Sequence, residues 1–135
     1  MGQMTLPFSH AAGMLESITW QPEIGLSRLD HDEALMSEIV QLLESALSER
    51  LDAMQSSALR QDFESLRQHT HAHLPSLKIM GFDQQARIFE AFESAVVMTD
   101  VTACQRLSPM VQKTWKDIIH LLNEYKSSVK FTSCV

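Results

Sequence analysis

Apolar side chains at helical spacing constrain this chain more than any other feature of its sequence. Between residues 35 and 122 they recur every three or four positions, which is the pattern of helices that bury one face. Only four Gly and four Pro occur among 135 residues, too few for the many turns of a sandwich or a barrel. The pattern therefore predicts an all-α protein.

Helix start and stop signals delimit the first two of four such segments. Asp30 and Glu33 form a capping-box pattern, which is followed by a stripe of Leu35, Ile39, Leu43, Ala46, Leu47, Leu51 and Met54. Asp62 is a natural N-cap and Gly81 a natural C-cap. The stripe between them consists of Phe63, Leu66, Thr70, His73, Leu77 and Met80.

Two further segments complete the set. The segment that starts after Asp83 carries Ala86, Phe89, Phe92 and Val96. The last one follows the Thr99-Asp100 turn, has Pro109 near a first turn or at a kink, and carries Leu107, Met110, Val111, Thr114, Trp115, Ile118, Leu121 and Leu122. Four such helices joined by short turns predict an up-down antiparallel four-helix bundle.

The two ends of the chain show a weaker pattern. We expect an N-terminal extension over residues 1–15, with a short extra helix around Ala11–Ile18, and the bundle over residues 16–125. The last ten residues, KSSVKFTSCV, contain no acid and little periodicity, so we expect a flexible C-terminal tail over residues 126–135.

Composition narrows the function. Seventeen acidic residues against eleven basic ones give a net charge of −6, which disfavours a nucleic-acid partner. The sequence has no apolar run long enough to span a membrane and no basic leader. Cys104 and Cys134 form no disulfide framework, so we expect a reduced, cytoplasmic protein. It has no phosphate-binding glycine loop, nucleophile elbow or dinucleotide fingerprint, so nothing indicates a turnover enzyme.

Three histidines lie within five residues in the stretch LRQHTHAHLPSLKIMGF. His73 falls on the buried stripe and His69 at its border, so His73 is expected to be a core histidine. His71 falls off the stripe, with Arg67 one turn before it and Lys78 two turns after it. The pattern predicts an exposed imidazole flanked by two cations.

A glutamate on the next helix is expected beside His71. In an antiparallel hairpin centred on residue 82, His71 lies eleven residues before the centre and Glu93 eleven after it. A carboxylate that accepts from Nδ1–H fixes the tautomer and leaves the lone pair of Nε2 free. A nucleophilic imidazole that faces solvent is what a phosphohistidine carrier requires.

In this register the sequence resembles the histidine-containing phosphotransfer (HPt) domains of two-component phosphorelays. The family places an N-cap Asp nine residues before the active histidine and a Gly ten after it, here Asp62 and Gly81. It also places an apolar residue five before and an apolar residue followed by Glu twenty-two after, here Leu66 and Phe92-Glu93. The resemblance covers roughly residues 16–125.

The resemblance implies that His71 is the phosphoacceptor and that Glu93 orients its ring. The family usually has Lys and Gly three and four residues after the histidine, where this chain has Leu74 and Pro75. On geometry, Lys78 or Arg67 would supply the missing cation. The implied partners are a response-regulator receiver domain, a hybrid sensor kinase, or both, docking over Leu74, Pro75 and Lys78.

No cofactor is expected on this chain, because the Mg²⁺ ion would be bound by the receiver. We also expect a monomer, because a bundle of this size can stand alone. Three other interpretations stay open. A degenerate HPt-like module would bind a receiver or a sensor kinase without carrying phosphate. His69 and His73 are four residues apart and would reach one metal ion from a single helix. A purely structural bundle is the third.

Overall fold

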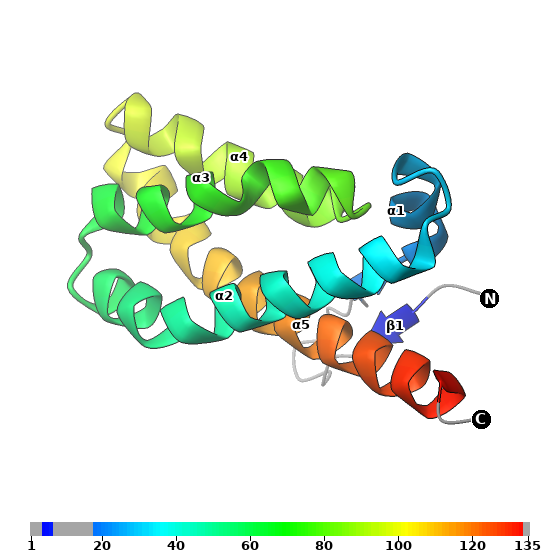
Figure 1. The fold of residues 1–135 in the computed structure, drawn as a ribbon. Helices are drawn as coiled ribbons and strands as arrows, with labels where there is room; N and C mark the ends of the chain where they lie inside the picture. Colours follow the sequence, from blue (N-terminus) through cyan, green and yellow to red (C-terminus); the bar gives the residue numbers. More distant parts are fainter. Residues whose placement is uncertain (1–3, 7–17, 134–135) are drawn as a thin grey trace.

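Four long helices form an antiparallel bundle in which each helix packs against two others (Figure 1). The computed structural model describes residues 4–6 and 18–133. The helices are α2 (Glu33–Leu59), α3 (Phe63–Ile79), α4 (Asp83–Val97) and α5 (Val101–Ser133). Helix contacts join α2 to α3, α3 to α4, α4 to α5 and α5 to α2. The predicted all-α four-helix bundle is confirmed.

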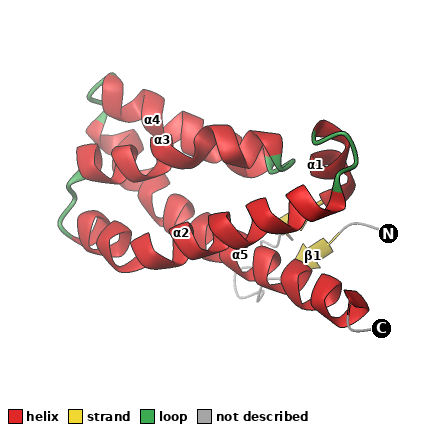
Figure 2. Ribbon diagram, viewed as in Figure 1, coloured by secondary structure: helices red, strands yellow, loops and turns green. Residues whose placement is uncertain are grey.

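A short helix and a two-stranded ribbon precede the bundle (Figure 2). Strands β1 (Met4–Leu6) and β2 (Ile18–Trp20) pair antiparallel, and the sequence analysis had predicted no strand. The extra helix is α1 (Pro22–Arg28), later in the chain than expected. Pro22 starts it because the fixed φ of proline suits a first helical position. Of the helix predicted around residues 11–18, Ile18 lies in β2, and residues 11–17 lie outside the described residues.

The two caps predicted for α3 are present. The side chain of Asp62 accepts from the backbone N–H of Ser65 at 3.2 Å and from its hydroxyl at 2.8 Å. At the other end Gly81 has φ +92°, a conformation that costs a residue without Cβ little. The N–H of Phe82 then donates to the carbonyl of Leu77 at 2.9 Å, as in a Schellman motif. These caps fix the length of the helix that carries the three histidines.

The cap predicted for the preceding helix was wrong. Helix α2 begins at Glu33, and its N-cap is Asp32, whose side chain accepts from the N–H of Leu35. Asp30 and His31 instead have φ of 57° and 60°, so they form the left-handed turn that links α1 to α2. Asp tolerates this conformation and also caps helices, which is why the pattern alone did not decide between the two aspartates.

Aromatic side chains fill the bundle and attach the N-terminal ribbon to it. Trp20 of β2 stacks on Phe82 at 4.5 Å between ring centroids, and its indole N–H donates to the carbonyl of Met80 at 2.7 Å. Trp115 of α5 is fully buried and donates to the carbonyl of Leu47 at 2.9 Å. Over residues 4–6 and 18–133, no helix combines the length and the apolar run that a membrane crossing requires.

The predicted stripes need correction at their edges. Leu35 and Met110 are exposed, whereas Met36 is buried at the start of α2. In α4 the stripe predicted that Val96 is buried, but Val96 is only half-buried and its neighbour Ala95 is buried instead. Each helix of the ring packs against two neighbours, so its buried arc is wider than one stripe and is turned relative to it.

The C-terminal segment also differs from its prediction. Helix α5 continues to Ser133 and contains Pro109 in its interior, so most of the expected irregular tail over 126–135 is helical. Tyr125 is buried, Val129 packs against the core, and Lys126 pairs with Glu44 of α2 at 3.0 Å. These contacts give the segment partners that its own sequence pattern did not reveal.

Candidate functional site

His71 lies on the outer face of α3 with its ring held from one side. Its side chain is 65% exposed, and Nδ1 lies 2.5 Å from Oε2 of Glu93 on α4. A carboxylate only accepts, so this close contact favours the tautomer with the proton on Nδ1. Among the described residues Nε2 has no hydrogen-bond partner, so its lone pair faces solvent.

The local sequence explains why these two side chains meet. The Gly81 turn reverses the chain between α3 and α4, and the two helices pack side by side along their length. Residues equally distant from the turn then lie at the same height, as His71 and Glu93 do. The contact predicted from the spacing is present in the structure.

Arg67 adds a cation to this contact. Its Nη1 donates to the same Oε2 of Glu93 at 3.1 Å, while Nε and Nη2 donate to the two carboxylate oxygens of Glu64 at 3.1 and 2.7 Å. The hydrogen bonds from Arg67 hold the pKa of Glu64 below its usual value. Arg67 is therefore engaged by two carboxylates, one of which also contacts His71.

Lys78 is the second cation on this face. It forms an ion pair with Glu90 across α3 and α4, and its side chain is 54% exposed. An exposed lysine pair is held weakly, so this ammonium is free to leave Glu90 for a stronger anion.

The two residues that depart from the HPt pattern have different surroundings. Leu74 is only 7% exposed and belongs to the core, so the expectation that a partner docks over this side chain was wrong. Both α2 and α4 pack against α3, which draws Leu74 inward. Pro75 is exposed, and α3 continues past it to Ile79. Because proline has no N–H, the carbonyl of His71 lacks its usual helical donor.

The other two histidines of the cluster lie on the inner side of α3. His73 packs edge-on against Trp115 at 5.7 Å but is only half-buried, so it lies at the edge of the core and not inside it as predicted. Burial lowers the pKa of His73 and of His69, and the nearby Arg50 lowers both further. His73 also lines a shallow pocket of about 350 Å³ between α2 and α3.

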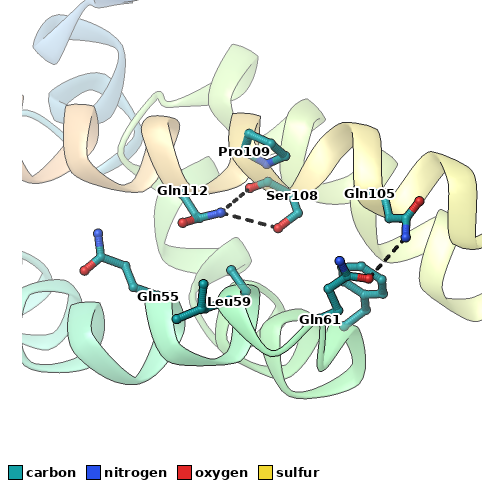
Figure 3. Close-up of a pocket in the computed structure, with 9 residues that line it drawn as sticks. Gln55, Leu59, Gln61, Gln105, Ser108, Pro109 and Gln112 are labelled. Atoms are coloured by element: carbon teal, nitrogen blue, oxygen red, sulfur yellow. Dashed lines mark hydrogen bonds between the residues drawn. The ribbon is translucent and has the colours of Figure 1, made fainter.

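A metal-binding cluster or a further pocket among the described residues would be a second candidate site. Over the described part of the chain, no group of three or more His, Cys, Asp or Glu side chains is placed to hold a metal ion. A pocket of about 510 Å³ lies between the end of α2, the start of α3 and α5. Figure 3 shows its lining of Gln55, Leu59, Gln61, Gln105, Ser108, Pro109 and Gln112, none of which is charged.

Comparisons with known proteins bear on the fold. No family model and no curated protein matches this chain. A solved structure described as the HPT domain from the Hpt sensor hybrid histidine kinase from Shewanella superimposes with a TM-score of 0.70. The fold is that of an HPt domain. The match covers 81% of this chain and 94% of the Shewanella HPt domain at 14% sequence identity, so it establishes a shared HPt architecture and leaves the activity to be argued from the site.

Sequence reasoning missed two carboxylates on the outer face. Glu64 lies three residues before Arg67, the spacing at which helical side chains pair, and this signal was available in the sequence. Glu90 faces Lys78 across the hairpin, and its partner depended on how α3 and α4 pack. With these two residues included, Arg67 and Lys78 both have acidic partners.

Proposed function

We propose that this chain is a histidine phosphotransfer protein of a two-component phosphorelay. His71 would accept a phosphoryl group from a receiver-domain phosphoaspartate and pass it to another receiver. The observation that carries the proposal is the exposed imidazole whose Nδ1 is bound by Glu93, with Nε2 open to solvent. A helix-borne imidazole in this state is both nucleophilic and accessible.

The chemistry needs little from the chain itself. The lone pair of Nε2 attacks phosphorus, the N–P bond forms, and the O–P bond of the acyl phosphate breaks, returning its electrons to the receiver's aspartate. The proton stays on Nδ1, and the positive charge that develops on the ring lies beside the carboxylate of Glu93. Transfer to the next receiver is the reverse reaction. Mg²⁺ and most of the charge stabilisation would come from the receiver, so the carrier needs no cofactor.

Lys78 is the cation that this proposal assigns to the phosphoryl group. Its side chain is 54% exposed, against 23% for Arg67, so it moves more freely toward an incoming anion. Pro75 and Lys78 would lie under the docked receiver or hybrid kinase. The proposal includes a monomeric carrier in the cytoplasm.

The test is phosphoryl transfer from labelled phospho-receiver domains of the same organism. We expect label on the wild type and on His73→Gln, a matched control two residues away, and none on His71→Gln. The bond should be acid-labile and base-stable, as a phosphoramidate is. Label that persists on a folded His71→Gln variant would contradict the assignment of the acceptor.

A second function is favoured by the core position of Leu74. The resemblance places a lysine there, and in this chain no cation occupies that position. A module of this kind would bind a receiver or a sensor kinase and regulate it without carrying phosphate. In the same assay, receivers that bind the wild type and never transfer label would support this function over the carrier.

A further inference from the structure

A line of alternating charges runs along the outer face of α3 and ends at the imidazole. Glu64 contacts Arg67, Arg67 contacts Glu93, and Glu93 contacts His71. The closest distances along the line are 2.7, 3.1 and 2.5 Å. Only the last of these contacts involves the ring, so the chain of contacts from Arg67 and Glu64 reaches His71 through Glu93.

The guanidinium of Arg67 uses two separate edges. The Nε and Nη2 edge is bound by both oxygens of Glu64, while Nη1 points to Oε2 of Glu93. A guanidinium is planar and its donors have fixed directions, so a two-point contact on one edge fixes where the remaining donor points. Glu64 therefore sets the direction from which Arg67 approaches Glu93.

The position of the Glu93 carboxylate depends on this approach. A glutamate has three side-chain torsions and would otherwise exchange between rotamers. Oε2 accepts from Arg67 and also lies 2.5 Å from Nδ1 of His71. The side chains of Arg67 and Glu93 are only 23% and 20% exposed, so solvent screens their attraction less than it screens a surface pair.

We propose that Arg67, held by Glu64, is a positioning residue that fixes the carboxylate of Glu93 against Nδ1 and so sets the tautomer of His71. Its role is distinct from that of a phosphoryl clamp, because a move toward the phosphoryl group would break its contacts with both glutamates. The inference deepens the proposed function and rests on it for its biological consequence. The contacts from which it is argued are those of the unphosphorylated protein.

The first experiment reads the tautomer directly and needs no phosphoryl donor. The ¹⁵N NMR shifts of the His71 ring are recorded at about pH 8, where a free imidazole is neutral. We expect the Nδ1–H form in the wild type and a shift toward the Nε2–H form in Arg67→Gln. Arg67→Lys should lie between them, because a single ammonium does not hold two carboxylates in the same geometry. The control is Arg106→Gln, an exposed arginine on α5.

Glu64→Gln provides a second variant that leaves Arg67 in place. It should shift the tautomer in the same direction by a smaller amount, and it keeps the test informative if Arg67→Gln does not fold. The rate of label transfer from a phospho-receiver should fall about tenfold or more in Arg67→Gln, the usual effect of losing a partner that orients a functional histidine.

The outcomes separate this inference from the proposed function. An unchanged tautomer in folded Arg67→Gln overturns the inference, and a lower transfer rate alongside it would assign Arg67 to the phosphoryl group instead. A shifted tautomer together with no labelling of the wild type by any receiver supports the positioning role and contradicts the carrier function. A shifted tautomer with slower transfer supports both.

Discussion

His71 and His73 lie two residues apart on α3, yet the helix places them in opposite surroundings. His71 is 65% exposed and contacts a carboxylate, whereas His73 is half-buried against the ring of Trp115 and has a lowered pKa. One imidazole keeps a nitrogen free for chemistry, and the other contributes packing. The side of the helix, set by the neighbouring helices, therefore decides what a histidine in this cluster can do.

The largest expected effect is a loss of stability on removing Trp115, whose ring packs against His73 on the inner side of α3. Trp115→Ala should lower the free energy of unfolding by about 3–5 kcal/mol, because it removes a large buried ring and leaves a cavity. Urea unfolding followed by circular dichroism measures the loss. The contact between His71 and Glu93 is made by α3 and α4 alone, so the folded fraction of this variant should still accept label. A cost below about 1 kcal/mol would show that the inner side is not the packed region described here.

A substitution on the outer side of α3 should instead raise the free energy of unfolding. Pro75→Ala restores a backbone N–H beside the carbonyl of His71, and proline in a helix interior costs about 3 kcal/mol relative to alanine. Part of this gain is offset, because proline also restricts the unfolded chain. We expect the free energy of unfolding to rise by about 2 kcal/mol. The urea midpoint measures it, and an unchanged or lower midpoint would show that α3 already accommodates the proline without cost.

The smallest expected effect is the pH dependence of the inner side. Burial lowers the pKa of His73 in the folded state from its ordinary 6.5, so the unfolded chain takes up a proton at a higher pH than the folded chain does. The contribution of His73 to the free energy of unfolding is therefore fully present at pH values well above about 6.5. It decreases as the pH falls below that value. His69 acts in the same direction.

Thermal unfolding between about pH 7 and 5 measures this fall. His73→Gln should flatten it, because the variant has no imidazole at position 73 to take up the proton. An identical pH slope in the wild type and the variant would mean that His73 is not the group responsible.

The same contrast explains what the sequence could predict. The Asp62 cap, the Gly81 turn and the spacing of His71 and Glu93 depend on local signals and on one hairpin, so the outer contact followed from the sequence. The burial of Leu74 did not follow from the sequence, because it depends on α2 and α4 both packing against α3. Where two neighbouring helices together determine whether a side chain is buried, as at Leu74, a single apolar stripe does not predict its burial correctly.

Two features at the ends of the chain were missed for different reasons. The C-terminal residues of α5 have a weak pattern of their own, but Tyr125 is buried and Lys126 reaches Glu44 of α2. At the other end, Pro22 followed by Glu23 is a helix-start signal that the sequence did contain. Contacts across the bundle, rather than local propensity, order the first of these segments.

The most direct test of the proposed site is to identify the nitrogen that carries the phosphoryl group. The protein is labelled with ¹⁵N on its histidine rings, phosphorylated by a phospho-receiver and studied by NMR through the coupling between nitrogen and phosphorus. The geometry predicts a single phosphorylated ring, that of His71, substituted at Nε2 while Nδ1 keeps its proton toward Glu93. Phosphate on Nδ1 of His71, or on His69 or His73, would contradict the site.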